Sequence, residues 1–229
     1  MPADEAKHCL RVMRLGVGAV VVVVDGLGMA CRGEIETISG RDVAVHVLSD
    51  VRGFGEPMVR LTLAAGLSVG AKFDSVVQRG TELGVSRFVP LLTEKSKVTI
   101  EEPGRAKTKL TRWRNVAAAA MKQCRRSYIP EIAAPTPYKS FLKQFERSDT
   151  GVIFHPGERV PALEQIGFPE NLKRITVVIG PESGFTDAEI IEAEQAGFVR
   201  VGLGRRILRT ETAGPVAVAL VMARLGEFR

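Results

Sequence analysis

The chain has 229 residues, and 45% of them are hydrophobic, which is enough to bury the core of one large domain or of two modest ones. Its 32 basic and 26 acidic residues give a net charge of +6, which suits a polyanionic partner and is also common among basic cytosolic proteins. The cysteines and histidines lack the spacing of metal ligands, no apolar run reaches the roughly 20 residues that span a bilayer, and the N-terminus lacks the apolar core of a signal peptide. We therefore expect a soluble cytoplasmic protein with reduced thiols, no metal and no membrane contact.

Short β segments cut by turns occupy the beginning of the chain. Residues 17–24, 29–38 and 43–48 are rich in β-branched side chains and are separated by glycine-containing turns, which predicts three antiparallel strands joined by hairpins. Three such strands favour a small barrel-like domain.

A helical segment precedes these strands, because His8, Arg11 and Arg14 recur at roughly helical spacing. Its residues that are placed to pack inward are Cys9, Val12 and Met13. Arg11 and Arg14 could contact RNA phosphates, or could simply belong to a solvated helix face.

Residues 50–57 are rich in glycine and end in proline, so we expect a linker there and two domains, 1–57 and 58–229. The second domain begins with a strand at 58–65, an amphipathic helix at 72–83 and a strand at 88–92. The residues of that helix expected to face inward are Phe73, Val76, Val77, Gly80 and Leu83. A short helix within 136–149 and a strand over 151–155 continue the alternation, which indicates an α/β fold.

Between Pro103 and Pro130 the sequence has eight basic residues and no acidic one. Apolar residues recur there at alternating spacings of three and four, which predicts one apolar stripe on a helix: Leu110, Trp113, Ala117, Ala120 and Cys124. Every basic residue falls outside that stripe, so we expect the positive charge to face outward, where it could neutralise several RNA phosphates. A charge run can also be no more than a solvated face, but the absence of compensating acids favours RNA.

The stretch from Ile175 to Ala213 organises the rest of the second domain. A β-branched run, 175–179, ends at Gly180, and Thr186 with Glu189 has the capping-box spacing that opens a helix. Gly197 is expected to end that helix and a second apolar run, 198–203, to form a strand. Thr212 is expected to cap a last helix over 213–225.

Two glycine-bearing loops, GPESGF and LGRRILRTETA, follow the strands of this stretch. In an open α/β sheet the ligand crevice lies beyond the carboxyl ends of the strands, so the two loops should be neighbours over one site. Gly180, Gly184 and Gly204 permit positive φ and close approach, which suits a flat adenine held by main chain, although these could also be ordinary turns. Neither loop contains G-x-G-x-x-G or G-K-[ST], which disfavours a Rossmann cofactor or a P-loop nucleotide.

The two loops together resemble the S-adenosylmethionine site of the SPOUT methyltransferases, and most closely that of the RsmE family, which methylates N3 of uridine 1498 in 16S ribosomal RNA. TELGVSRFVPLLTEKS at 81–96 and AAAMKQCRRSYIPEI at 118–132 resemble the same family, which usually has glycine at the positions of Ser183 and Arg125. The resemblance implies an α/β domain with a parallel sheet tied in a trefoil knot. It also implies a preceding PUA-like RNA-binding β-barrel domain, here shortened at its N-terminus.

The resemblance further implies a homodimer that uses S-adenosylmethionine and acts on 16S ribosomal RNA in the small ribosomal subunit, with no membrane or metal. The cofactor residues carried over are Gly180, Pro181, Glu182, Gly184, Leu203, Gly204, Ile207, Leu208, Arg209, Thr210, Thr212 and Ala213. The residues expected to bind RNA are Arg11, Arg14, Lys97, Arg112, Arg125 and Arg126.

Uracil N3 becomes a nucleophile only as its proton leaves, so the reaction implied by the resemblance asks for a cation near the uracil oxygens and an acceptor for that proton. The candidates for the catalytic residues are Arg209 or Arg126 as the cation and Glu211 as the base. Glu211 could instead pair with a neighbouring arginine, Arg205, Arg206 or Arg209, to shape the loop. Glu182 could face the cationic end of the cofactor or cap the helix that follows it.

Two other functions stay open. The chain could be a non-catalytic RNA-binding or ribosome-assembly protein that keeps the basic surface, or a SPOUT methyltransferase with another RNA target such as transfer RNA. Binding of S-adenosylmethionine separates the first alternative from an enzyme.

Overall fold

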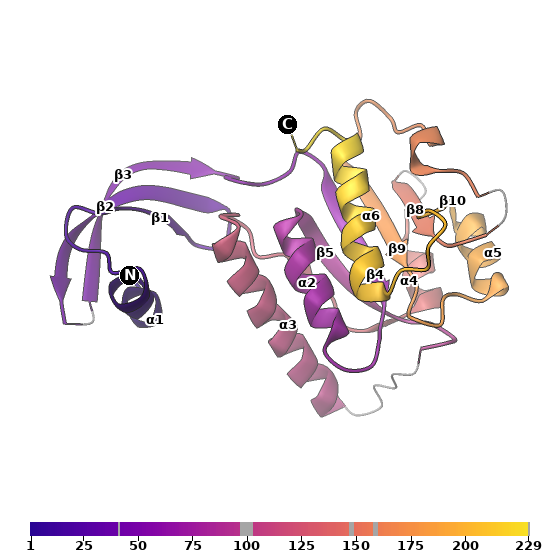
Figure 1. Cartoon of the computed structure of the whole chain (residues 1–229), viewed down its shortest axis with the longest axis horizontal. Helices are drawn as coiled ribbons and strands as arrows, with labels where there is room; N and C mark the ends of the chain where they lie inside the picture. Colours follow the sequence, from indigo (N-terminus) through magenta and orange to yellow (C-terminus); the bar gives the residue numbers. More distant parts are fainter. Residues whose placement is uncertain (41, 97–102, 147–148, 158–159, 229) are drawn as a thin grey trace. The chain divides into compact units, whose positions relative to one another are not determined.

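The computed structural model of the chain describes residues 1–40, 42–96, 103–146, 149–157 and 160–228 (Figure 1). The chain divides into two compact units. The smaller unit contains Met1–Glu56 together with Lys122–Tyr128, and the larger contains Pro57–Met121 and Ile129–Arg229. The inclusion of Lys122–Tyr128 in the smaller unit has no counterpart in the sequence-based expectation.

The smaller unit is built on a three-stranded antiparallel sheet with the order β1-β2-β3. Its strands are β1 (Val20–Val24), β2 (Met29–Ser39) and β3 (Asp42–Arg52). The three predicted strands and their antiparallel pairing are therefore confirmed. β3 runs further than expected, to Arg52, so the stretch expected to be a linker is partly strand.

The N-terminal helix faces the sheet differently from the expectation. Helix α1 (Ala3–Lys7) passes directly into a π-helical turn, η1 (His8–Val12), and the buried residue is Ala6. Val12 and Met13 are exposed, so the prediction that they pack inward is wrong. A π-helix has a wider turn than an α-helix, and the 3.6-residue period on which that prediction depended does not hold across it.

Among its described residues, the larger unit contains a seven-stranded sheet in which every strand pair is parallel. Its main order is β10-β8-β9-β4-β5-β6, and β7 also pairs with β5. The strands are β4 (Arg60–Gly66), β5 (Val85–Leu92), β6 (Glu131–Ile132), β7 (Thr136–Pro137), β8 (Thr150–Phe154), β9 (Arg174–Ile179) and β10 (Phe198–Val201). The α/β class with a parallel sheet is therefore confirmed.

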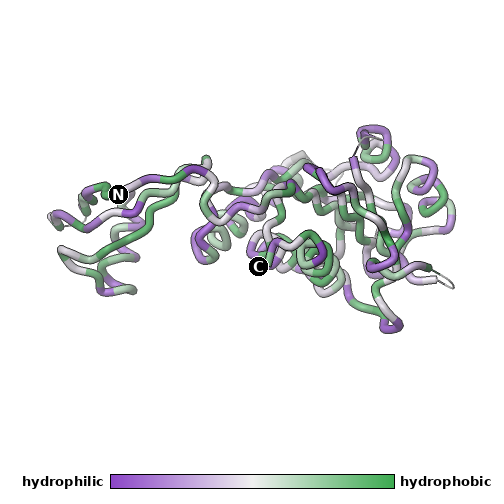
Figure 2. The backbone as a smooth tube through the Cα atoms, turned by 90° about the horizontal axis from the view of Figure 1, so that it is seen from above, coloured by the Kyte–Doolittle hydropathy of each residue, from purple (hydrophilic) through white to green (hydrophobic). Residues whose placement is uncertain are grey.

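Helices cover both faces of this sheet (Figure 1). One apolar cluster joins β4 and β9 to α2 (Lys72–Glu82), α3 (Pro103–Gln123) and α6 (Thr210–Arg224). The same cluster includes a 3-10 turn, η2 (Leu163–Gln165). A second cluster joins the opposite sides of these strands to α4 (Tyr138–Gln144) and α5 (Asp187–Ala196). Figure 2 shows hydrophobic residues gathered along the central strands, as expected of parallel strands buried on both faces.

The inward faces predicted for α2 and α3 are confirmed. Phe73 and Val76 of α2 and Trp113 and Ala117 of α3 are buried. The rings of Phe73 and Trp113 lie 4.6 Å apart at 54°, and Trp113 Nε1 donates a hydrogen bond of 3.1 Å to Asp74 Oδ1. These contacts fix α3 against α2 and leave the polar side of α3 facing outward.

Helix α6 begins at Thr210, three positions before the predicted start, so the prediction that Thr212 caps it is wrong. The residue at the N-cap is Arg209, whose carbonyl oxygen accepts hydrogen bonds from the N–H groups of Thr212 and Ala213 at 2.8 and 2.7 Å. Pro215 consequently lies inside the helix, where it has no N–H to donate to the carbonyl oxygen of Glu211.

Candidate active site

The loop after β9 leads from the sheet into α5. Thr186 caps this helix: its Oγ1 accepts the N–H of Glu189 at 3.2 Å, and Glu189 Oε2 accepts the N–H of Thr186 at 2.9 Å. The predicted capping box is therefore confirmed. Because the box already caps the helix, the expectation that Glu182 could serve as its cap is wrong.

The two glycine loops meet at the carboxyl edge of the sheet. Thr210 Oγ1, at the end of the loop after β10, donates a hydrogen bond of 3.2 Å to the carbonyl oxygen of Gly180. Gly184 and Gly204 both have positive φ, 67° and 86°. Apart from Gly204 and its two chain neighbours, no described residue has an atom within 4 Å of the position that a Cβ would take on Gly204. Ile207 is 94% exposed, so this loop presents main chain and an apolar side chain to open space.

A third segment, which the sequence reasoning missed, supports the loop after β9. A Cβ on Gly66, the last residue of β4, would lie 2.3 Å from the backbone nitrogen of Pro181 and 2.4 Å from its Cδ. Only glycine allows the end of β4 to approach the Gly180-Pro181 turn so closely. A glycine at the end of a central strand is a usable sequence signal for such an approach.

Ser183 stands where the resemblance has glycine, and the structure gives its hydroxyl a partner. Ser183 Oγ donates a hydrogen bond of 2.8 Å to the carbonyl oxygen of Lys95, and Lys95 Nζ donates one of 3.1 Å to the carbonyl oxygen of Phe185. The serine therefore ties the loop after β9 to the segment that follows β5.

Glu211 lies in the first turn of α6, beside the junction of the two loops. Its carbonyl oxygen, deprived of a helical partner by Pro215, accepts a hydrogen bond of 3.1 Å from Arg79 Nη1. Its side-chain Oε2 is buried and has no hydrogen-bond partner among the residues that the structure describes. Within the same residues Glu211 forms no ion pair with Arg205, Arg206 or Arg209, so the alternative that it pairs with one of them is wrong. A buried carboxylate oxygen without a donor is suited to accept a proton or a hydrogen bond from a ligand.

The three arginines of this loop differ from Glu211 in exposure. Arg205, Arg206 and Arg209 are all exposed. The backbone of Arg209 begins α6, so its side chain starts from a fixed point beside Glu211 and extends into solvent. The role of Arg209 as the cation near the site stays a prediction.

Arg126 is buried within the smaller unit, which argues against the roles in catalysis and RNA binding expected for it. Its side chain is 3% exposed and belongs to the smaller unit, where Nη2 and Nε lie 2.7 and 3.2 Å from Glu56 Oε2. Glu56 Oε1 accepts the N–H groups of Ser127 and Tyr128 at 3.0 and 2.9 Å. This buried network occupies the guanidinium and leaves it no surface to offer to RNA.

The remaining residues expected to bind RNA fall into three groups. Arg11, Arg14 and Arg125 are exposed. Arg112 pairs with Asp74 of α2 while much of its side chain stays in solvent. Lys97 lies outside the described residues.

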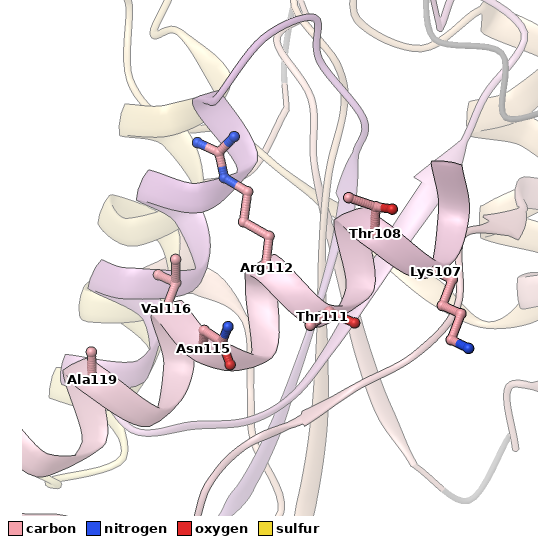
Figure 3. Close-up of a pocket in the computed structure, with 7 residues that line it drawn as sticks. All are labelled: Lys107, Thr108, Thr111, Arg112, Asn115, Val116 and Ala119. Carbon is pink, nitrogen blue, oxygen red and sulfur yellow. The ribbon is translucent and has the colours of Figure 1, made fainter. Parts of the chain in front are cut away.

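A shallow, open groove of about 690 Å³ lies along the side of α3 that carries Arg112 and Val116. The residues that line it all come from this helix (Figure 3): Lys107, Thr108, Thr111, Arg112, Asn115, Val116 and Ala119. The lining contains two cations, two hydroxyls and an amide but no carboxylate. The surface that the lining exposes is mainly apolar, so only the two cations, Lys107 and Arg112, suit an anionic backbone such as the phosphates of RNA.

Arg125 has a φ of 61°, in the left-handed region that favours glycine. This backbone conformation explains why the family that the sequence resembles usually has glycine at this position. We expect Arg125→Gly to be more stable than Arg125→Ala by about 1 kcal/mol, because only alanine keeps the steric strain of a Cβ at this φ. Urea-induced unfolding of the two variants measures the difference. Both variants remove the same charge, so equal stabilities would mean that the backbone at Arg125 is not strained.

Among the described residues, no group of three or more His, Cys, Asp or Glu side chains could hold a metal ion. In the same part of the chain, no helix is long and apolar enough to span a membrane. Cys9, Cys31 and Cys124 form no disulfide with one another.

Comparisons with known proteins relate this architecture to a family. The model of an RNA methyltransferase domain matches residues 55–222, and the model of an RNA methyltransferase PUA domain matches residues 2–48. Ribosomal RNA small subunit methyltransferase E of Synechocystis is 34% identical over 217 residues, which cover 94% of this chain and 69% of the relative. The protein of that name from Bacillus subtilis is 29% identical over 225 residues, which cover 95% and 87%.

A solved structure agrees with these relatives. Ribosomal RNA small subunit methyltransferase E from Neisseria gonorrhoeae, bound to S-adenosyl methionine, superposes with a TM-score of 0.86 at 29% identity, covering 98% of this chain and 90% of that one. The domain match extends over most of the chain and the Synechocystis relative exceeds 30% identity. The chain therefore belongs to the family of RNA methyltransferases named Ribosomal RNA small subunit methyltransferase E.

Proposed function

We propose that this chain transfers a methyl group from S-adenosylmethionine to N3 of uridine 1498 of 16S ribosomal RNA in the small ribosomal subunit. The observation that carries the proposal is the buried, unpartnered carboxylate oxygen of Glu211 beside two joined glycine loops. The names of the relatives and the S-adenosyl methionine bound to the Neisseria protein support the reaction and the cofactor.

The two loops fit S-adenosylmethionine. Gly204 leaves open space for a ligand to approach the main chain. Gly184 has the positive φ that closes the turn after β9, and its N–H donates a hydrogen bond of 2.8 Å to the carbonyl oxygen of Pro181. When bound, S-adenosylmethionine supplies a methyl group made electrophilic by the sulfonium. The residues proposed to hold it are Gly180, Pro181, Glu182, Gly184, Leu203, Gly204, Ile207, Leu208, Arg209, Thr210, Thr212 and Ala213.

The chemistry left to the chain is the deprotonation and placement of uracil. Glu211 Oε2 accepts the N3 proton, directly or through a water molecule, because it is the buried acceptor without a donor at this place. Arg209 neutralises the negative charge that then develops on the uracil oxygens. With Arg126 held by Glu56, Arg209 is the remaining candidate for the cation. The hydrogen bond from Arg79 to the carbonyl oxygen of Glu211 fixes the turn that carries the base.

RNA binding is proposed to depend on exposed cations in both units. Arg11, Arg14 and Arg125 belong to the smaller unit, which we propose is a PUA-like RNA-binding barrel domain over 1–57. Lys107 and Arg112 line the groove on α3, in the methyltransferase domain proposed over 58–229. Phosphate contacts of this kind supply affinity that is independent of sequence and weakens with salt.

Three further features are proposed from the family. The return of α6 from the loop after β10 to pack against α2 and β4 is compatible with a trefoil knot. An outward apolar face on α6, with exposed Leu220 and half-buried Val216 and Ala219, suits a homodimer. The reaction is proposed to take place in the cytoplasm, where ribosomal subunits are found.

A methyl-transfer assay tests the function. Small subunits from a strain that lacks the uridine-N3 modification are incubated with labelled S-adenosylmethionine, and the modified nucleoside is mapped by mass spectrometry. We expect label in 3-methyluridine at position 1498 of 16S RNA. Label elsewhere would assign another RNA target, and a protein that binds no S-adenosylmethionine would instead be a non-catalytic RNA-binding protein.

A further inference from the structure

One ion pair reaches a glycine loop from outside it. Lys72, the first residue of α2, pairs through Nζ with Glu182 Oε1 in the loop after β9. The two residues lie 110 positions apart in sequence, and their side chains are 39% and 35% exposed. Of the ion pairs between described residues, this one alone involves either glycine loop. A ligand that enters the site therefore meets a positive and a negative group side by side.

The surroundings keep Glu182 charged. Partial burial raises the pKa of its carboxyl, but the hydrogen bond and charge of Lys72 and the backbone N–H of Glu182 outweigh burial, so the pKa lies below its ordinary value. The hydroxyl of Ser68, just after β4 and 5% exposed, also favours the carboxylate. Ser68 Oγ makes no hydrogen bond of standard geometry with any residue that the structure describes. The hydroxyl is thus a spare polar group beside the pair.

The chemistry of the cofactor matches this arrangement. The amino-acid end of S-adenosylmethionine carries an ammonium and a carboxylate on one carbon atom. The glycine loops offer main chain to the flat adenine, and among the described residues no ion pair forms between two residues of these loops. In the sheet, β4 lies next to β9 on the side opposite to β8 and β10, and α2 follows β4 in the chain. A ligand held by both loops can therefore extend toward Lys72 at the start of α2.

We propose that Lys72 and Glu182 bind the amino-acid end of the cofactor, Lys72 Nζ receiving its carboxylate and the Glu182 carboxylate receiving its ammonium. The inference rests on the proposed function, because it names the residues with which the same site recognises its cofactor. Two charge-assisted hydrogen bonds replace the ion pair of the free protein. Lys72 and Glu182 then determine ligand specificity. They give a higher affinity for the complete cofactor than for an adenosine thioether that lacks the amino-acid end.

Two stable analogues test the proposal by calorimetry, without any catalytic turnover. S-adenosylhomocysteine keeps the amino-acid end, whereas 5′-methylthioadenosine keeps the adenosine and the sulfur but lacks that end. We expect Lys72→Met and Glu182→Gln each to weaken the affinity for S-adenosylhomocysteine by about tenfold. The affinity of both variants for 5′-methylthioadenosine should equal that of the unaltered protein. Lys72→Arg, which keeps the charge, should retain most of the preference for S-adenosylhomocysteine.

Lys139→Met is the matched control. Lys139 on α4 forms an ion pair of the same kind with Glu192 on α5, at 3.0 Å. The substitution is expected to leave the affinity for both analogues unchanged. Equal weakening of both analogues in Lys72→Met would show that the pair only shapes the loop and would overturn the inference. Equal affinity of the unaltered protein for both analogues would also overturn it. If the unaltered protein bound neither analogue, the result would instead contradict S-adenosylmethionine as the cofactor and so contradict the proposed function.

Discussion

Replacing Glu56 with alanine is expected to lower the free energy of unfolding of the smaller unit by about 3–5 kcal/mol, because it removes the carboxylate that forms a buried ion pair with the guanidinium of Arg126. The side chain of Glu56 also accepts two backbone N–H groups, of Ser127 and Tyr128, which would lose their acceptor. Hydrogen exchange measured by mass spectrometry reports the effect as lost protection in β1–β3 and in residues 122–128. Trp113, which belongs to the larger unit, provides a fluorescence signal for that unit.

An exposed ion pair provides the control for this prediction. Glu131→Ala breaks the pair of Glu131 with Arg87, at 3.2 Å and largely in solvent, and is expected to cost about 0–1 kcal/mol. Glu56→Gln combined with Arg126→Met removes both charges and should be less destabilising than Glu56→Ala alone. If Glu56→Ala lowered the free energy of unfolding by no more than Glu131→Ala, the Arg126 network would contribute little to the stability of the smaller unit.

Local periodicity allowed much of the fold to be predicted. The inward face of α2, the apolar stripe of α3 and the capping box of Thr186 and Glu189 each depend on residues within a few positions of one another. The same kind of reasoning failed at η1, where the helical turn itself changes width. It failed again at α6, which was expected to begin after a cap at Thr212 but begins at Thr210.

The pairing of distant charges could not be predicted in this way. Arg126 is one of eight basic residues in a stretch without acids, but its partner Glu56 comes from 70 positions earlier in the chain. Lys72 and Glu182 are likewise brought together only by the sheet order, in which β4 pairs with β9. The rule that strand ends share an edge predicted that the glycine loops are neighbours, but it does not say which side chains at that edge meet.

The largest effect on the reaction is expected from Glu211→Gln, which should lower kcat for methyl transfer by about 10²–10⁴-fold because glutamine cannot take the N3 proton. The amide has nearly the same shape as the carboxyl, so the affinity for S-adenosylhomocysteine is expected to stay as it is. Single-turnover transfer to small subunits, measured with cofactor and subunits in excess of their dissociation constants, isolates the chemical step.

A dependence on pH separates a base from a residue that only shapes the loop. Uracil loses its N3 proton unaided in alkaline solution, so the rate of Glu211→Gln relative to the unaltered enzyme should rise as the pH is raised toward that range. Glu194→Gln, at an exposed position of α5, removes the same charge away from the loops and is expected to leave kcat unchanged. A deficit in Glu211→Gln that stays constant across the alkaline range would assign Glu211 to positioning, and the proton would then pass to water or to another group. Because Oε2 of Glu211 is the buried acceptor without a donor beside the two loops, we expect the deficit to shrink.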